Sequence, residues 1–583
     1  MSHILEELPE TLDETYERIL QEIPKANRVH AHRLLQCLTV AARPLRVQEL
    51  AEVLAVDFNA AGGIPQLNED WRWKDQEQAV LTACSSLIAV VNFQNSFMVQ
   101  FSHYSVKEFL ASDRLAAANF DILRFHHIRP EPAHTIMAQA CVGVLLRLTQ
   151  PINNEAKMRF PLADYAAKHF ADHADFGNVV SRITKAIDEL LDEDKPHFAA
   201  WMSYISSSWW SKKHSGLSKA SPLYHVAELG FRGLVRYLVL KRPQDVIVRG
   251  GVHGTPMHAA LCRRHFQVFE LLLPRCMDPD IRDSSGQTLL HVAVVTGLVE
   301  VVQLIIGRGA DVNAEDSDGW PPLHRIINTM PQFDDRNLDH NSEVEAKDNE
   351  HVTPLFYAGR NGQLASIGYS DIIRLLLEHG ADIQVTNGEH NTPLHLAASL
   401  GKLSAVQLLI EKGAILHMPG KFGRTPLHFA SFSGYPDIIR LLLERGADIQ
   451  ATDDEHNTPL HLAASLGKLS AVQLLIEKAA ILHMPGMLGR TPLHFASFSG
   501  YPDIIRLLLE HGADIQATDD EHNTPLHLAA FKGKLSAVQL LIEKGAILHV
   551  LGNQGKTPLH LASLNGYPDI ERLILESSLL HSC

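Results

Sequence analysis

The chain has 583 residues and a formal net charge of −15, and 45% of its residues are hydrophobic. This length exceeds what one hydrophobic core supports, so it predicts several domains or a repeat array. The negative charge argues against nucleic acid or an anionic membrane as the main partner, because both attract positively charged surfaces.

The cysteines and the short apolar runs indicate the compartment. Six cysteines are scattered without paired spacing, which suits free thiols in a reducing environment. The N-terminus MSHILEELPE is acidic and lacks the apolar stretch of a signal peptide, and no apolar run approaches the ~18 residues of a membrane span. We therefore expect a cytoplasmic protein without membrane contact, with a nuclear location left open.

Residues 1–115 predict a winged-helix domain. Apolar spacing favours four helices followed by the two strands of a hairpin, at 12–23, 27–42, 47–54, 76–87, 87–92 and 97–102. A winged helix suggests DNA binding, but this segment holds 10 lysines and arginines against 16 aspartates and glutamates, the wrong sign for a phosphate backbone. We therefore predict a packing and relay module that binds no nucleic acid.

Several stretches of the first 220 residues carry a family resemblance. Three lie in the winged-helix domain: LPETLDETYERIL (8–20), RPLRVQELAEVLAVD (43–57) and FSHYSVKEFLASDRL (101–115). Two more follow, AHTIMAQACVGVLLRL (133–148) and FPLADYAAKHFADHA (160–174). The first three resemble the winged-helix segment, named after GPI inositol-deacylase, that follows the NACHT nucleotide-binding domain in fungal NLR-like proteins. The other two resemble the helical connector of those proteins, which we place at 116–220.

From residue 221 onward the chain is repetitive. The tetrapeptide TPLH or a close variant recurs at intervals of 32 to 39 residues, beginning at Ser221, Thr255, Thr288, Pro321, Thr353, Thr392, Thr425, Thr458, Thr491, Thr524 and Thr557. In the unit 425–457, Thr425 is a helix N-cap and Pro426 suits the first helical position, whereas Gly434 and Gly446 end the two helices. Two short helices and a hairpin tip that stack unit on unit predict a mainly α solenoid of about eleven units.

This pattern closely resembles the ankyrin repeat over residues 221–583. The resemblance implies that the histidine of each TPLH is buried and ties helix to loop, which makes a metal-binding role for these histidines unnecessary. Two units depart from the pattern. In 321–352 the second helix lacks its leucine run, and we expect a loop or frayed helix and a weak layer there. The last unit, 557–583, has Glu571 where Ile439 and Ile505 stand in earlier units, which fits a C-terminal cap.

Residues 392–457 and 458–523 are nearly identical and look like a recent duplication. Only four of 66 positions differ, namely Gly413/Ala479, Lys421/Met487, Phe422/Leu488 and Arg445/His511. The family resemblance implies that hairpin tips and first helices line the concave face that binds protein partners. Apolar and acidic tips alternate, and we take as candidate partner-binding residues Lys421, Phe422, Asp454, Glu455, Met487, Leu488, Asp520, Glu521, Asn553 and Gln554.

The sequence shows no catalytic motif. The phosphate loop GxxxxGK[ST] is missing, since its nearest match, GNQGKT at 552–557, is too short, and there is no HExxH, GxSxG or zinc-spaced cysteine pair. We therefore predict no enzyme activity, catalytic residue, cofactor, metal or nucleotide. The chain begins about where a NACHT domain would end, so it resembles a receptor of this type without its switch. A stand-alone paralogue and a truncated gene product both stay open.

We expect non-enzymatic protein recognition by the solenoid, in fungal NLR-like sensing or regulation. The alternative is a passive scaffold or adaptor that recruits an enzyme or pathway component, including one that regulates specialised metabolism. Neither hypothesis identifies the partner or its pathway.

Overall fold

The computed structural model describes residues 12–93, 96–150, 152–207, 220–329 and 366–580. They belong to two compact units, residues 1–277 and 278–583, each of which is described by itself. The predicted domain limits at residues 115 and 220 both fall inside the first unit, and the second unit consists of repeats.

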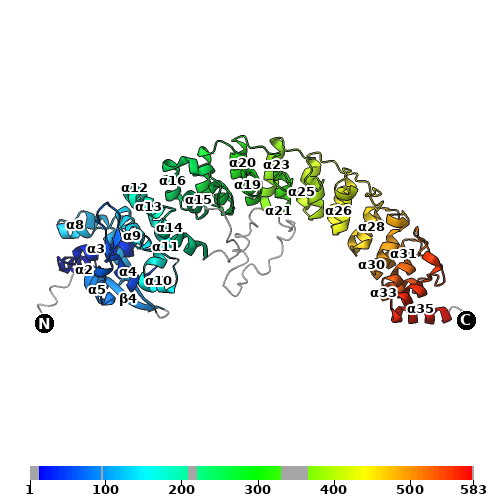
Figure 1. Ribbon diagram of the computed structural model, residues 1–583, viewed down its shortest axis with the longest axis horizontal. Coiled ribbons are helices and arrows are strands. Elements are labelled where there is room, and N and C mark those ends of the chain that lie inside the picture. Colours follow the sequence, from blue (N-terminus) through cyan, green and yellow to red (C-terminus); the bar gives the residue numbers. More distant parts are fainter. Residues whose placement is uncertain (1–11, 94–95, 151, 208–219, 330–365, 581–583) are drawn as a thin grey trace. The chain divides into compact units, whose positions relative to one another are not determined.

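The N-terminal part of the first unit is a winged-helix domain (Figure 1). Its three-stranded antiparallel sheet has the order β1-β5-β4. The elements are α2 (Leu12–Glu22), α3 (Arg28–Val40), β1 (Leu45–Arg46), α4 (Val47–Val53), α5 (Gln76–Cys84), β4 (Ile88–Phe93), β5 (Ser96–Phe101), α6 (Tyr104–Leu110) and α7 (Asp113–Ala116). They confirm the predicted helices and hairpin, whose tip at 94–95 lies outside the described residues. A short hairpin of β2 (Val56–Asp57) and β3 (Gln66–Leu67) was not predicted.

Two buried glutamates of α4 form contacts inside the first unit. The Glu49 carboxylate accepts two hydrogen bonds from the Arg43 guanidinium, at 2.8 and 2.7 Å. The Glu52 carboxylate accepts the Leu162 N–H at 2.7 Å and pairs with Arg72. Helix α4 is thereby joined to the connector, because a buried carboxylate that is hydrogen-bonded at this distance resists separation.

The connector is helical, as predicted. Its helices are α8 (Asp121–His126), α9 (Pro130–Leu145), α10 (Asn154–Arg159), α11 (Ala163–Ala174), α12 (Val179–Arg182), α13 (Thr184–Leu190) and α14 (Pro196–Ser207). Helices α9 and α11 pack closely because their facing sides are rich in alanine. Two repeat pairs complete the first unit: α15 (Pro222–Glu228) with α16 (Arg232–Lys241), and α17 (Pro256–Cys262) with α18 (Phe266–Leu272).

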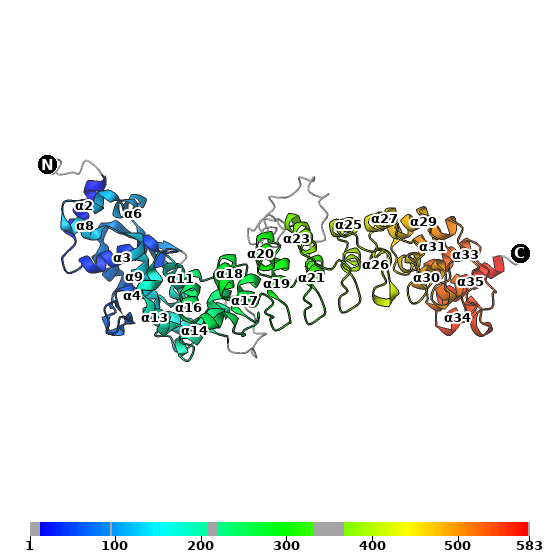
Figure 2. The same cartoon turned by 90° about the horizontal axis from the view of Figure 1, so that it is seen from above.

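The second unit stacks helix pairs in two rows, which Figure 2 shows side by side. The first helices are α19 (Leu289–Thr296), α21 (Pro322–Thr329), α24 (Pro393–Ser399), α26 (Pro426–Ser433), α28 (Pro459–Ser465), α30 (Pro492–Ser499), α32 (Pro525–Phe531) and α34 (Pro558–Leu564). The second helices are α20 (Val299–Ile306), α23 (Ser366–Glu378), α25 (Leu403–Glu411), α27 (Pro436–Glu444), α29 (Leu469–Glu477), α31 (Pro502–Glu510), α33 (Leu535–Glu543) and α35 (Pro568–Leu580). The expected loop in 321–352, from residue 330 onward, and the repeat start at Thr353 lie outside the described residues.

Each layer is held by a small apolar core. Leu427 and Ala430 of α26 are buried, as the repeat pattern predicted, and Ile439 and Leu442 of α27 are fully buried beside them. Burying one leucine or isoleucine side chain contributes roughly 1.5–3 kcal/mol. Neighbouring first helices pack on each other, as do neighbouring second helices, so one layer covers the apolar face of the next.

Candidate partner-binding surface

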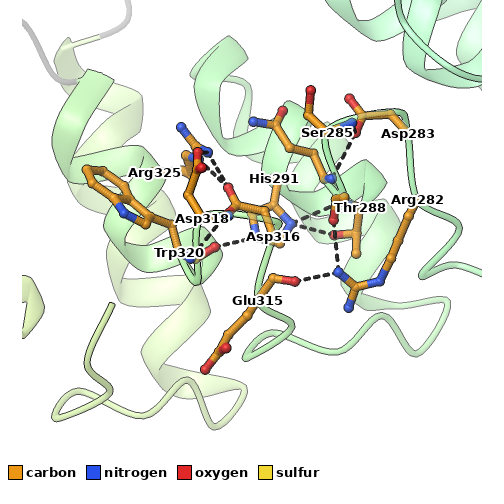
Figure 3. A network of polar contacts seen from close by, with 12 residues as sticks. Arg282, Asp283, Ser285, Thr288, His291, Glu315, Asp316, Asp318, Trp320 and Arg325 are labelled. Atoms are coloured by element: carbon orange, nitrogen blue, oxygen red, sulfur yellow. Dashed lines mark hydrogen bonds and ion pairs between the residues drawn. The ribbon is translucent and has the colours of Figure 1, made fainter. Parts of the chain in front are cut away.

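The histidine of each TPLH fixes the loop that carries the next tip. Figure 3 shows this contact at the start of the second unit, where the Nε2–H of His291 donates to the Trp320 carbonyl at 2.8 Å. The ring's Nδ1 accepts the backbone N–H of Thr288 at 3.1 Å. Since a backbone N–H only donates and a carbonyl only accepts, the ring is neutral with its proton on Nε2. Burial lowers the pKa of His291, which favours this neutral form.

The same tie recurs along the array. His428 donates to the Asn457 carbonyl and His494 to the Asn523 carbonyl, both at 3.0 Å, and both rings are fully buried. His461 bonds the carbonyls of Met484 and Arg490 at 3.1 Å. The structural role expected for these histidines is therefore confirmed. Within the described ranges, no group of three or more metal-binding side chains comes together.

The hairpin tips of the second unit are of two kinds. In an aspartate tip, Asp453 Oδ1 accepts the backbone N–H groups of Glu455 at 3.0 Å and Asn457 at 2.8 Å, and Asp519 does the same one duplication later. Asp316 in Figure 3 makes the equivalent bonds to Asp318 and Trp320. Two bonds from one carboxylate hold the tip in a single conformation.

In a glycine tip, the preceding unit supplies the missing acceptor. Gly420 stands where the aspartate would, and the amide oxygen of Asn391 accepts the Lys421 N–H at 3.0 Å. A Cβ on Gly420 would lie 2.5 Å from that same oxygen, so only glycine fits. The contact recurs between Asn457 and Met487 at 3.0 Å and between Asn523 and Asn553 at 3.1 Å.

The aspartate tips depend in turn on the glycine tips. Arg424, at the end of a glycine tip, pairs through Nε with the buried Oδ2 of Asp453 at 3.2 Å. Arg490 makes the same pair with Asp519 at 3.2 Å. The interfaces therefore alternate, and the smallest block that repeats all of them is two units. This explains why the near-identical blocks are 66 residues long, since copying a single unit would break both kinds of contact.

The ten candidate residues lie in one continuous row, which we call the tip ladder. The structure joins its five tips by the asparagine contacts above and by two backbone bonds of 3.0 Å, from the Asp454 N–H to the Phe422 carbonyl and from the Asp520 N–H to the Leu488 carbonyl. The ladder consists of Lys421, Phe422, Asp454, Glu455, Met487, Leu488, Asp520, Glu521, Asn553 and Gln554.

Two bulky apolar residues of the tip ladder are both exposed and strained. Phe422 is 57% exposed with φ +62°, and Leu488 is 45% exposed with φ +60°. Left-handed backbone costs a residue with a Cβ roughly 1–2 kcal/mol. Met487 beside them is 41% exposed. Gln554 holds the same backbone conformation in the third glycine tip, with φ +56°, so the strain belongs to the position and the apolar side chains are particular to the first two tips.

Arginines and aromatic rings adjoin the apolar tips. The Arg424 guanidinium lies 5.3 Å from the Phe422 ring centre and 5.5 Å from that of Phe432 on α26. Arg490 lies 5.7 Å from the Phe498 ring on α30. These stacked cations fix the edge between tips and first helices.

The bridging asparagines and the Arg–Asp pairs were missed in the sequence. Asn391, Asn457 and Asn523 recur every 66 residues rather than every 33, and so do Arg424 and Arg490. That doubled period was the available signal, because a residue that appears only in alternate units serves contacts that occur only at alternate interfaces.

Comparison with known protein families supports two parts of the chain. The family model described as ankyrin repeats (3 copies) matches residues 223–316, 363–453, 451–519 and 516–581. The model described as GPI inositol-deacylase, winged helix domain, matches residues 16–123. Across the described ranges, no helix is long and apolar enough to cross a membrane.

One curated relative carries a printed role. The chain is 28% identical over 290 residues to the azaphilone pigments biosynthesis cluster protein L of Monascus ruber. The alignment covers 46% of this chain and 60% of that protein, so the chain spans less than two thirds of the relative's length.

Proposed function

The chain belongs to the ankyrin-repeat family, whose model matches more than half of its residues, and from this premise we propose that it recognises a protein partner through the tip ladder. Ankyrin solenoids present extended concave surfaces for protein partners. In this proposal that surface is formed by the tips together with the exposed side of the first helices, where Phe432 and Phe531 are each 40% exposed.

The observation that carries the proposal is the strained, exposed apolar pair of Phe422 and Leu488. Neither side chain is buried by the fold, and a left-handed backbone is unfavourable for both. Residues that lower stability without improving packing are common at binding sites, and exposed aromatic and apolar side chains are the usual anchors of protein interfaces. Binding of a partner would cover these side chains and account for their presence.

The role we propose is non-enzymatic, without nucleotide or cofactor. The combination of a GPI inositol-deacylase-type winged helix with ankyrin repeats is compatible with fungal NLR-like sensing or regulation. Missing phosphate-loop and hydrolase motifs in the sequence support binding without catalysis.

A second candidate is a scaffold or adaptor for specialised metabolism. It is favoured by the similarity to a protein named for an azaphilone pigment biosynthesis cluster. Both candidates use the tip ladder for binding and differ in what is bound. A partner that is a biosynthetic enzyme or its regulator would select the second.

The experiment compares two triple variants by cross-linking mass spectrometry in the native cell. The first combines Phe422→Ala, Met487→Ala and Leu488→Ala. The control combines Ile415→Ala, Ile481→Ala and Ile547→Ala, three isoleucines of the loops after the second helices that are 50%, 42% and 54% exposed. We expect the tip variant to lose about 2 kcal/mol or more of binding free energy with a nearly unchanged Tm. Equal recovery of partners by both variants would contradict the proposal.

A further inference from the structure

The tip ladder alternates two kinds of surface at a fixed step. Going along the array, an apolar tip with Phe422 is followed by the acidic tip Asp454–Glu455, then by the apolar tip Met487–Leu488 and the acidic tip Asp520–Glu521. Each tip is bonded to its neighbour, so the alternation is held rigidly. A partner that lies along the ladder meets these surfaces in this order.

The carboxylates of the acidic tips are unneutralised. All four side chains are exposed, and none of them forms an ion pair with another of the described residues. Glu455 and Glu521 accept hydrogen bonds only from the side-chain amides of Asn457 and Asn523, at 3.2 Å. The nearby cations are already paired, since Lys421 binds Glu389 at 2.7 Å and the two arginines bind buried aspartates. The free charge of the ladder is therefore negative.

The step between tips sets the spacing of a complementary ligand. Packed helix axes lie about 9 Å apart, and the first helices α26, α28 and α30 pack in succession, so two apolar tips are separated by about 18 Å. An extended polypeptide advances about 3.3 Å per residue. One layer thus corresponds to about three residues and the distance between apolar tips to about six.

From this match we propose that the ladder binds an extended, basic polypeptide segment of the pattern Φ-x-x-(Lys/Arg)-x-x-Φ-x-x-(Lys/Arg), where Φ is a large apolar residue. The inference rests on the proposed function and specifies its partner. The apolar side chains contact Phe422 and then Met487 and Leu488, and the basic side chains reach the acidic tips between and beyond them. Charge complementarity guides association and register, whereas the apolar anchors supply most of the affinity.

The test is fluorescence anisotropy with the full chain and labelled synthetic peptides. The matched peptide has the order Phe-x-x-Lys-x-x-Phe-x-x-Lys, with glycine and serine at x. One control peptide has the same composition but places Phe and Lys on alternate residues, and a second replaces Lys with Glu. We expect the matched peptide to bind at least about tenfold more tightly than either control and to weaken with added salt.

Two protein variants locate the contact. The tip variant combines Asp454→Asn, Glu455→Gln, Asp520→Asn and Glu521→Gln. The control variant removes the same charge from exposed glutamates at the ends of second helices, by Glu444→Gln, Glu477→Gln, Glu510→Gln and Glu543→Gln. We expect the tip variant to lose about tenfold in affinity for the matched peptide and most of its salt dependence, and the control variant to lose little.

Each outcome decides the inference. Equal binding of matched and respaced peptides, equal loss in both charge variants, or no binding of any peptide would overturn it. If the peptides fail while the apolar tip variant still loses its cross-linked partners, the proposed function stands and the extended basic partner is wrong. If the matched peptide binds as expected and cellular partners are unaffected by the tip substitutions, the ladder recognises this chemistry but is not the site used in the cell.

Discussion

Replacing Ala479 with glycine should stabilise the array. Ala479 follows helix α29 with φ +65°, a left-handed conformation that L side chains rarely adopt. At the same place in other units stand Gly413, Gly446, Gly512 and Gly545, with φ between +87° and +93°. The alanine therefore occupies a position that the repeat otherwise reserves for glycine.

The magnitude follows from two opposing contributions. A Cβ in left-handed backbone costs roughly 1–2 kcal/mol, and its removal loses no packing, because a Cβ built on any of those four glycines meets no atom within 4 Å. Glycine also makes the unfolded chain more flexible, which offsets about 0.4–1 kcal/mol. The net gain in unfolding free energy should be about 0.5–1 kcal/mol.

The reciprocal substitution is the matched control. Gly413→Ala lies in surroundings that are nearly identical, because 392–457 and 458–523 differ at only four positions, and it should destabilise by a similar amount. Urea unfolding followed by far-ultraviolet circular dichroism would measure both, and the double swap should restore the original midpoint. An unchanged or lowered midpoint in Ala479→Gly, or a neutral Gly413→Ala, would refute the reasoning.

Three further predictions concern the tips, pH and nucleotides. Leu488→Asn should raise the unfolding free energy by about 0.5–1 kcal/mol, because asparagine tolerates left-handed backbone, yet weaken partner capture; a gain in both would show that Leu488 is not an anchor. Burial lowers the pKa of His395, His461 and His494 to about 4, from the ordinary 6.5. The unfolded chain therefore binds more protons between these values, and at pH 5.5 each histidine should cost roughly 1 kcal/mol relative to pH 7. The urea midpoint should fall from about pH 6.5 towards pH 4 and level off below it, and a midpoint independent of pH in this window would contradict the neutral-ring network. Equilibrium dialysis should detect no ATP or GTP binding by this chain, since the backbone cradle of a phosphate loop is missing from its sequence; micromolar, magnesium-dependent binding would overturn this.

The positions of the repeat helices were predictable because each start has its own local chemistry. Threonine before proline, with histidine two residues further on, caps a helix and ties it to a loop, and the structure places first helices after Thr392, Thr425 and Thr458 as expected. The tips were predictable for the same reason, since they lie between a helix-ending glycine and the next threonine. Apolar periodicity likewise located the helices and the hairpin of the winged-helix domain.

Contacts between units were much harder to predict. Nothing in the letters distinguishes Asn457, which bonds Met487, from an ordinary surface asparagine, because the contact depends on how two units stack. The left-handed backbone of Phe422 is imposed by its place in the tip rather than by phenylalanine itself. The buried carboxylates of Glu49 and Glu52 read as surface charges in the sequence, since only tertiary packing supplies their partners.

Photocross-linking from the ladder itself tests the central claim most directly. Phe422 would be replaced by p-benzoylphenylalanine, which keeps an aromatic side chain at the tip, and Ile415 by the same residue as the matched exposed control. After irradiation in the native cell, the tip position should give a covalent adduct with a discrete protein partner, and the Ile415 position should give none. Adducts of equal yield from both positions, or none from the tip under conditions in which the unsubstituted chain retains its partners, would contradict recognition through the tip ladder.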